Sequence, residues 1–322
     1  MNILITGGAG FIGSYLAQEL LERGNRVTII DNLSTGRLNN INHIYKNKNL
    51  NVYIDTIFNE ELIEDVIKKS DQIYHLAAAV GVQFIVDNPV ETIETNVAGS
   101  EIVIRLANKY KKKIFIASTS EVYGKSDSLP FKEGKDRVYG STSVRRWSYA
   151  ESKAIDEFLA LAYWHEKKLP VVIGRLFNTV GPRQTGQYGM VIPRFVRQAL
   201  LGHPITVFGD GTQSRCFTYV EDVVGAIIKL MDTKKCLGEI FNIGSTAETK
   251  IIELAQKIKK MTNSSSKIKK ISYDEAYEEG FEDMKRRVPD ISKLKKFIDY
   301  SPKVKLEQTL NKVIDYHKGN KF

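Results

Sequence analysis

Tyr149 and Lys153 are the residues whose types and spacing most directly suggest chemistry. They are four positions apart in RRWSYAESKAIDEF, so a helix through this stretch would place the phenol and the ammonium on one face. A free tyrosine has a pKa of about 10 and is a poor base at neutral pH. A neighbouring ammonium favours the phenolate and lowers that pKa. The spacing therefore predicts that Tyr149 acts as a general base beside Lys153.

Hydroxyl side chains form a second candidate group in STSEVYG, residues 118–124, directly after an apolar run at 114–117. A strand through that run would end at the ligand crevice of a parallel sheet. Thr119 or Ser120 could there hydrogen-bond a reacting oxygen, whereas Tyr123 is predicted to be structural.

Three evenly spaced glycines, Gly7, Gly10 and Gly13, lie between an apolar run and a segment of helical period. Between a strand and a helix, Gly7 permits a tight turn, Gly10 lets a pyrophosphate approach, and Gly13 allows close packing. The N-terminus of the helix would face the phosphates. Asp31, which ends the next apolar run, would accept hydrogen bonds from an adenosine ribose and disfavour a 2′-phosphate. NAD is therefore predicted rather than NADP.

Strands that alternate with helices must position these residues. Helical patterns at 15–23 and 97–110 separate short, β-rich apolar runs, which lie at 3–5, 27–30, 73–76, 114–117 and 171–173. This rhythm predicts an α/β fold with a Rossmann-type, doubly wound parallel sheet.

The rhythm breaks after about Gly174, and helical patterns return at 251–261 and 306–317. We expect an NAD-binding domain of residues 1–174 plus about 216–243. A smaller C-terminal substrate-binding lobe would comprise about 175–215 plus 244–322.

Together these motifs resemble the extended short-chain dehydrogenase/reductase superfamily, whose members often act on nucleotide sugars. The resemblance covers essentially the whole chain, including G-x-x-G-x-x-G, YHLAAAVG at 74–81 and ETNVAGS at 94–100. It implies a catalytic triad of Tyr149, Lys153 and a hydroxyl, with Thr119 favoured over Ser120. It assigns to the cofactor Gly7, Gly10, Phe11, Ile12, Gly13, Asp31, Asn32, Asp55, Leu76, Ala77, Ala78, Asn96, Tyr149 and Lys153.

The resemblance also implies a substrate, a nucleotide-diphosphate sugar and most simply a UDP-sugar. GRLFNTVGPRQTGQYG, residues 174–189, resembles the family's crossing into the substrate lobe, where Asn178 matches a residue that contacts the diphosphate. Arg215 and Arg287 match phosphate-binding arginines. A guanidinium suits a diphosphate because it offers a planar fork of donors.

Glu121 indicates which reaction follows, because simple 4-epimerases of this superfamily generally carry a small or neutral residue there. UDP-glucuronate decarboxylases resemble this chain in T-S-E-V-Y-G, and RW-Y-x-x-SK at 146–153 and RCFT at 215–218 extend the match. The resemblance implies oxidation at C4 to a transient 4-keto sugar and loss of CO2 from a uronate. Arg145 or Arg146 could pair with the substrate carboxylate. A UDP-uronate decarboxylase is the first expectation, with Glu121 among the catalytic residues; a structural role for this acid stays open.

Other outcomes remain open from the sequence. A 4-epimerase acting on UDP-glucose, UDP-glucuronate or UDP-N-acetylglucosamine is the first alternative, and a nucleotide-sugar 4,6-dehydratase is the second. A non-catalytic NAD-binding regulator represents a different class, but such proteins commonly lose the Tyr-Lys pair that is present here.

Composition narrows the partners. The 322 residues are 42% hydrophobic and 26% charged, as in ordinary globular proteins, and no apolar stretch is long enough to span a bilayer. The net charge of +9 is dispersed in short lysine clusters without interleaved aromatic residues, which argues against nucleic acid. A positive field would attract an anionic substrate.

The remaining polar residues suggest neither metal nor disulfides. His75, His165 and His203 have no metal-ligand spacing, and Cys216 and Cys236 are too few for a disulfide framework. The start lacks a signal peptide, so we expect a cytoplasmic enzyme. Family resemblance implies a homodimer formed by the helix after Asn96 and the helix of Tyr149.

Overall fold

A parallel sheet of seven strands lies at the centre of the protein. The structure, a computed structural model, describes all residues except 187–188, 277–281, 283 and 320–322. The strand order is β11-β6-β5-β4-β1-β2-β3, and every neighbouring pair is parallel. The strands are β1 Asn2–Thr6, β2 Arg26–Ile30, β3 Leu50–Tyr53, β4 Gln72–His75, β5 Lys113–Thr119, β6 Val171–Leu176 and β11 Glu239–Ile243. The predicted doubly wound α/β fold is confirmed.

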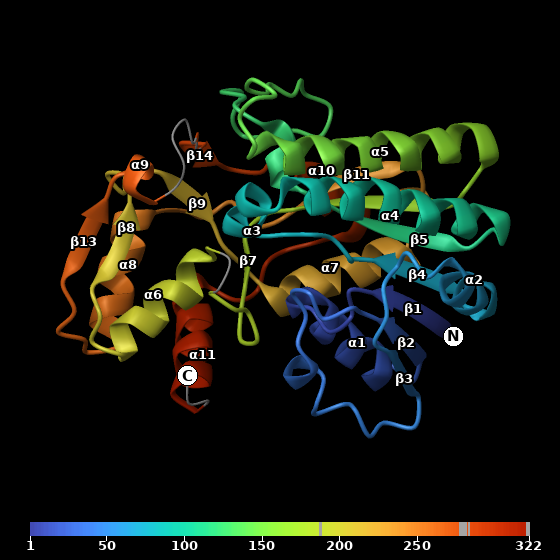
Figure 1. Ribbon diagram of the computed structural model, residues 1–322, viewed down its shortest axis with the longest axis horizontal. Coiled ribbons are helices and arrows are strands. Elements are labelled where there is room, and N and C mark those ends of the chain that lie inside the picture. The colour runs from blue at the N-terminus through green and yellow to red at the C-terminus, as the bar shows by residue number, and fades with distance from the viewer. Residues whose placement is uncertain (187–188, 277–281, 283, 320–322) are drawn as a thin grey trace.

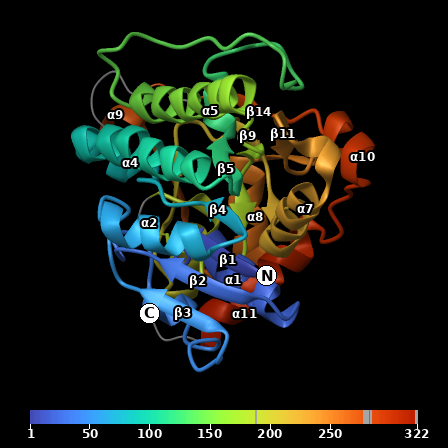
Figure 2. The same cartoon turned by 90° about the vertical axis from the view of Figure 1, so that its right-hand side faces the viewer.

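Helices cover both faces of this sheet, as Figures 1 and 2 show. One face packs into a single apolar core with α1 (Phe11–Glu22), α7 (Val220–Asp232) and α10 (Ser292–Ile298). The other face packs against α2 (Glu60–Lys69), α4 (Pro89–Lys109) and α5 (Trp147–Lys167). Both faces are therefore buried, as an all-parallel sheet requires.

A second lobe with its own apolar core lies beside the sheet, on the left of Figure 1. Its core unites residues of α6, α8 and α11 with the parallel strand pair β8 and β13. A three-stranded sheet in the order β12-β9-β14 adjoins it. The remaining elements are α3 Val82–Asp87, β7 Thr179–Val180, α6 Val191–Leu200, β8 Ile205–Phe208, β9 Ser214–Cys216, β10 Thr218–Tyr219, β12 Glu248–Lys250, α8 Ile251–Met261, β13 Ile268–Ile271, α9 Tyr273–Ala276, β14 Arg286–Arg287, α11 Leu306–Gly319 and the 3-10 turns η1 Leu38–Asn40, η2 Ser120–Tyr123 and η3 Lys234–Cys236.

The five predicted apolar runs all lie in strands, but two sheet strands were missed. β3 is an edge strand whose residues are partly or largely exposed, so its sequence carries little apolar signal. β11 lies beyond about Gly174, where the predicted alternation of strands and helices breaks off. α4 begins eight residues before its predicted start because Pro89 occupies the first helical turn, where its fixed φ and missing N–H are tolerated.

The order of the strands determines where a ligand can bind. β1 pairs with β2 on one side and with β4 on the other, so successive connections leave in opposite directions. A crevice opens at the carboxyl ends of strands at such a switch point. β5 ends there at Thr119, and η2 continues into the space beside the first turn of α5.

Candidate active site

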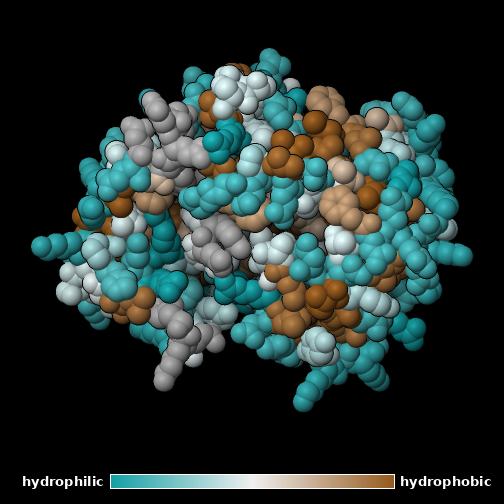
Figure 3. Space-filling view, viewed as in Figure 1, coloured by the Kyte–Doolittle hydropathy of each residue, from teal (hydrophilic) through white to brown (hydrophobic). Residues whose placement is uncertain are grey.

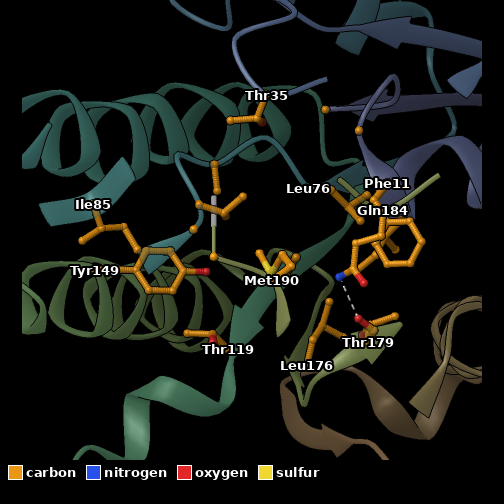
Figure 4. A pocket seen from close by; sticks show the side chains of 18 of the residues that line it. Phe11, Thr35, Leu76, Ile85, Thr119, Tyr149, Leu176, Thr179, Gln184 and Met190 are labelled. Atoms are coloured by element: carbon orange, nitrogen blue, oxygen red, sulfur yellow. Dashed lines mark hydrogen bonds between the residues drawn. The ribbon is translucent and has the colours of Figure 1, made fainter. Parts of the chain in front are cut away.

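A cavity of about 470 Å³ lies at these strand ends and extends to the second lobe. Figure 4 shows Tyr149 and Thr119 facing one space, with Phe11, Leu76 and Met190 around it. Of the predicted site residues, Lys153 and Asn96 do not line it. Those that do are Gly7, Gly10, Phe11, Ile12, Gly13, Asp31, Asn32, Asp55, Leu76, Ala77, Ala78, Thr119, Ser120, Glu121, Tyr149, Asn178, Arg215 and Arg287.

The glycine loop between β1 and α1 forms one wall. Gly7 has a φ of +73°, and a Cβ added there would lie 2.7 Å from the backbone nitrogen of Ala77. A Cβ on Gly13 would collide with the carbonyl oxygen of Gly7. These positions therefore need glycine for the turn and for the approach of helix to strand. The backbone at the start of α1 is left open to a pyrophosphate, as the spacing predicts.

Asp31 stands at the end of β2 and lines the same cavity. Its Oδ2 accepts a hydrogen bond of 2.9 Å from the Ala9 N–H, and its Oδ1 accepts one of 2.8 Å from the Leu33 N–H. Burial raises the pKa of this carboxyl, and these backbone donors oppose the rise. The Gly10 N–H also acts on this carboxylate, whose two oxygens together offer about four acceptor sites, so it can still accept from a ribose hydroxyl. Glycine loop and acid together fit a dinucleotide.

Tyr149 and Thr119 meet because β5 ends opposite the first turn of α5. Burial raises the pKa of the Tyr149 phenol well above its ordinary value, and the carboxylates of Glu121 and Asp156 raise it further. A hydrogen bond with the Thr119 side chain and the charge of Arg287 oppose that rise. The phenol is thus held against a hydroxyl in the cavity and is protonated at neutral pH in the protein by itself.

Lys153 takes a different position from the one expected. Its Nζ lies 2.7 Å from Asp156 Oδ2, and both side chains are almost fully buried. Asp156 balances the ammonium in the protein without NAD, so the expectation that Lys153 and the positive nicotinamide together lower the pKa of Tyr149 stays a prediction. Asn96 also lies behind the wall: its Oδ1 accepts the Ala79 N–H at 2.9 Å, and its Nδ2 donates to Ser152 Oγ at 3.1 Å.

Glu121 sits between two buried guanidiniums in the cavity wall. Its Oε1 lies 3.2 Å from Arg287 Nη2, and its Oε2 lies 3.6 Å from Arg146 Nη2. The three side chains are no more than 10% exposed. Of the two arginines considered for a substrate carboxylate, Arg146 lines the cavity whereas Arg145 is exposed outside it.

The two predicted phosphate arginines are neighbours although 72 positions separate them. Arg215 on β9 and Arg287 on β14 are register partners in a parallel pair, and both line the cavity. Asn178 lies between β6 and β7 on the path into the second lobe. Arg287 lies beside Arg215 and also contacts Glu121. It therefore joins the side of the cavity formed by the second lobe to the side that holds Tyr149.

The second lobe adds lining residues that sequence reasoning missed. The Arg194 guanidinium lies 3.9 Å from the ring centroid of Phe208, and both residues line the cavity with Gln213 and Tyr273. They come from α6, β8, the following loop and α9. Arg194 lies on the polar face of α6 with Gln198, and both bond Thr206 Oγ1, so no signal in the sequence set it apart from an ordinary surface arginine.

Other polar residues have structural places. Tyr123 is fully buried, donates to Asn242 Oδ1 at 2.7 Å and stacks on Phe131, as predicted. His75 is buried, whereas His165 and His203 are exposed. Within the described ranges, no cluster of histidine, cysteine or acidic side chains is suited to a metal, and no helix is long and apolar enough to cross a membrane.

Comparison with known proteins shows which enzymes this chain resembles. At 46% identity over 97% of this chain and 96% of the relative, the chain is similar to UDP-N-acetyl-alpha-D-glucosaminuronate decarboxylase of Bacillus cytotoxicus. UDP-glucuronic acid decarboxylase 1 of Xenopus tropicalis is 36% identical over 98% of this chain and 72% of its own length.

A solved structure agrees over the full length. UDP-glucuronic acid 4-epimerase of Bacillus cereus, in complex with UDP-glucuronic acid and NAD, matches with a TM-score of 0.89 and 31% identity over 99% of each chain. The model of the GDP-mannose 4,6-dehydratase family matches residues 4–313. The glycine loop, the Tyr149–Thr119 pair and these likenesses lead to one conclusion: the chain belongs to the GDP-mannose 4,6-dehydratase family, within the extended short-chain dehydrogenases/reductases.

Proposed function

We propose that the protein is a UDP-uronate decarboxylase that acts through a transient 4-keto sugar. The buried group of Arg146, Glu121 and Arg287 beside Tyr149 carries this proposal. The guanidiniums of Arg146 and Arg287 lie against the carboxylate of Glu121 in the cavity wall, and a guanidinium suits the carboxylate of a uronate. The relatives named as decarboxylases of UDP-glucuronic acid and its N-acetylated counterpart support the same substrate class.

NAD is the cofactor that the cavity fits. Gly7, Gly10 and Gly13 would admit its pyrophosphate at the start of α1, and Asp31 would bond its adenosine ribose. When bound, it supplies a hydride acceptor and the positive charge of the nicotinamide ring. That charge, added to Lys153, would offset the raised pKa of Tyr149.

Tyr149 performs the first proton transfer. Its phenolate oxygen takes the proton of the sugar C4 hydroxyl while the hydrogen on C4 leaves as hydride, so a ketone forms. Thr119, which already bonds the phenol, holds the same hydroxyl in line; Ser120 is the alternative. The two side chains come from β5 and α5, rigid elements that fix their separation.

The carboxyl group then leaves from a β-keto acid. The C5–C6 bond breaks, CO2 departs, and the electron pair moves into the C4 carbonyl as an enolate. C5 receives a proton, one taken up from solvent for each CO2 released, and hydride returns to C4 while Tyr149 returns its proton. Arg146 holds the carboxylate before it leaves, and Glu121 orients Arg146 and Arg287.

We further propose that the two parts of the chain divide the ligands. Residues 1–174 plus about 216–243 would hold NAD, and about 175–215 plus 244–322 would hold the nucleotide sugar. Asn178, Arg215 and Arg287 would contact the diphosphate, because the register pairing of the arginines gives adjacent forks of donors. α10 is an exception in space, since it packs in the core beneath the sheet.

Epimerisation at C4 is the second candidate function. The full-length likeness to a UDP-glucuronic acid 4-epimerase favours it, and the first step is common to both reactions. A keto sugar that turns in the cavity and takes hydride back on its other face becomes an isomer. A 4,6-dehydratase, in which water leaves across C5–C6, is third.

Product analysis separates these reactions. Purified protein is incubated with NAD and UDP-glucuronate, UDP-N-acetylglucosaminuronate, UDP-glucose or UDP-N-acetylglucosamine, and products are followed by chromatography and mass spectrometry. Decarboxylation predicts a UDP-pentose from a uronate, with the mass of CO2 lost. An isobaric product without such loss rejects decarboxylation in favour of epimerisation, and loss of water indicates dehydration.

Two adjacent arginines offer a matched control. Arg146→Met removes the guanidinium in the cavity wall, whereas Arg145→Met removes one exposed on the surface. We expect Arg146→Met to raise the KM for a UDP-uronate far more than Arg145→Met. Equal effects of the two substitutions would reject Arg146 as the carboxylate site.

We also propose a homodimer formed through α4 and α5. Val90 on α4 and Phe158 on α5 are 66% and 64% exposed, and Ile93 and Ile155 are exposed beside them. Figure 3 shows apolar atoms gathered over these helices. Such a patch suits a protein interface. Phe158→Asp should yield monomers in light scattering; an unchanged mass, or a monomeric parent protein, would reject this interface.

A cytoplasmic location completes the proposal. Both cysteines, Cys216 and Cys236, are free and buried, which suits a reducing compartment. Fractionation of the source cells with an antibody checks this location, and recovery outside the cytoplasmic fraction would contradict it.

A further inference from the structure

Lys153 and Asp156 form a buried ion pair on the face of α5 that carries Tyr149. The three positions are spaced by four and three residues, so their side chains share one face of the helix. Lys153 Nζ lies 2.7 Å from Asp156 Oδ2, and the two side chains are 2% and 1% exposed. A buried ammonium is costly unless a counter-charge compensates it, and Asp156 provides that charge.

A chain of hydrogen bonds leads from the cavity wall to Ser100, whose side chain acts on this carboxylate. The Ala77 N–H donates to Thr6 Oγ1 at 3.3 Å, and Thr6 Oγ1 lies 2.7 Å from His75 Nδ1. His75 Nε2 lies 3.0 Å from Ser100 Oγ. The Ser100 hydroxyl in turn interacts with Asp156. The chain joins β1, β4, α4 and α5, and Ala77 itself lines the cavity.

The polarity of this chain follows from the state of His75. Burial and the Lys153 ammonium lower the pKa of His75 to about 3, so the ring is neutral and has one donor and one acceptor nitrogen. Thr6 Oγ1 accepts from Ala77, which leaves its O–H for Nδ1. Nε2–H can then donate to Ser100, and the Ser100 O–H to Asp156. Every donor is directed toward the carboxylate that holds Lys153.

We propose that Asp156 is the positioning residue of Lys153: it holds the ammonium by one of three N–H groups and leaves the others for the NAD site. This inference rests on the proposed function, because it concerns how Lys153 serves that site. Asp156 does not touch the reacting atoms; it acts through the lysine. Burial raises the pKa of the Asp156 carboxyl, and the Lys153 ammonium and the Ser100 side chain oppose that rise.

The charges around the pair predict that the effect of Asp156 on ligand binding depends on pH. The titratable groups that face it are His75 from β4 and Tyr149 and Glu157 on α5. Asp156→Asn removes the counter-charge, so the pKa of the buried ammonium falls. As the pH rises through that lowered value, Lys153 loses its proton and its hold on the ligand. Wild type retains the Asp156 counter-charge over the same range.

Calorimetric titration with NAD+ measures this loss of binding without requiring turnover. The dissociation constant is determined from neutral to alkaline pH for wild type, Asp156→Asn and Lys153→Met. We expect Asp156→Asn to bind about tenfold more weakly at alkaline pH, the loss of one charge-assisted hydrogen bond. Glu157→Gln is the matched control, because it breaks the adjacent buried pair with Arg175 Nη2 at 2.7 Å. This control variant should show no loss of NAD+ affinity at alkaline pH.

The outcomes separate this inference from the proposed function. If Lys153→Met binds NAD+ as wild type does, Lys153 does not serve the NAD site and this inference is overturned, whereas failure of the wild type to bind NAD+ would reject the proposed function. If Lys153→Met weakens binding but Asp156→Asn follows the wild-type profile, Asp156 is not the positioning residue. Should Asp156→Asn not fold, Ser100→Ala removes one hydrogen bond from the carboxylate and raises its pKa. As the pH is lowered, the binding of NAD+ should then weaken at a higher pH than in wild type. An unchanged pH profile on the acid side overturns the inference.

Discussion

Glu121→Gln tests the charge balance of the site in the intact protein. Glu121 faces Arg287 Nη2 at 3.2 Å and Arg146 Nη2 at 3.6 Å. At an effective dielectric constant of about 20, unit charges at such separations attract by roughly 5 kcal/mol each, before desolvation is subtracted. Removing one partner from a buried pair costs about 3–5 kcal/mol, since the remaining charge stays uncompensated. We expect this loss in the free energy of unfolding.

The loss converts to a thermal shift that a ligand should reverse selectively. For a chain of this size about 1 kcal/mol corresponds to about 2 °C, so the Tm should fall by about 6–10 °C. A uronate brings a carboxylate to the two arginines and restores the missing charge, whereas a neutral hexose does not. UDP-glucuronate should therefore raise the Tm of Glu121→Gln more than UDP-glucose does, and by more than in wild type.

Differential scanning calorimetry of wild type, Glu121→Gln and Glu157→Gln provides the assay. Glu157→Gln breaks the buried pair with Arg175, which lies away from Glu121. This variant should therefore lose stability, but UDP-glucuronate should not raise its Tm more than UDP-glucose does. The reasoning is refuted if Glu121→Gln melts as wild type does. It is also refuted if UDP-glucose and UDP-glucuronate raise its Tm equally.

Three further outcomes follow from the same structure. Tyr149→Phe should abolish turnover and leave NAD binding intact in calorimetry; unchanged turnover would reject the catalytic assignment. Gly13→Ala should weaken NAD binding at least about tenfold, because its Cβ would meet the Gly7 carbonyl; wild-type affinity would contradict this. Hydrogen bonds from the Arg286 guanidinium lower the pKa of Glu248 to about 2, so their stabilisation is present above the ordinary value and lost as the pH falls toward 2. Arg286→Gln should lower the stability measured by denaturant unfolding at neutral pH, and that difference should shrink as the pH falls toward 2.

The cofactor half of the site was predictable because its information is local. Gly7, Gly10 and Gly13 lie on one turn, and Asp31 ends the very next strand, so strand–turn–helix periodicity alone places all four at one strand end. The structure confirms that they line one cavity. Each position follows from the conformation of its own segment.

The charge group of the substrate half was not predictable in the same way. Glu121 comes from η2, Arg146 from the residue before α5, and Arg287 from β14 in the second lobe. No spacing relates them, because the packing of the two lobes brings them together. Arg145 and Arg146 are adjacent and alike in sequence, and the start of α5 decides which of them faces the cavity.

The surroundings of Tyr149 show what a spacing motif leaves out. Helical spacing places Lys153 on the face of Tyr149, but it places Asp156 there as well, one further turn along. The carboxylate neutralises the ammonium, so burial controls the phenol. In the proposed function, the positive charge that arrives with NAD would favour the phenolate, so proton transfer would depend on an occupied site. Arg146 and Glu121 would link the proposed function to the substrate in a similar way, because a uronate carboxylate would enter beside their buried charges.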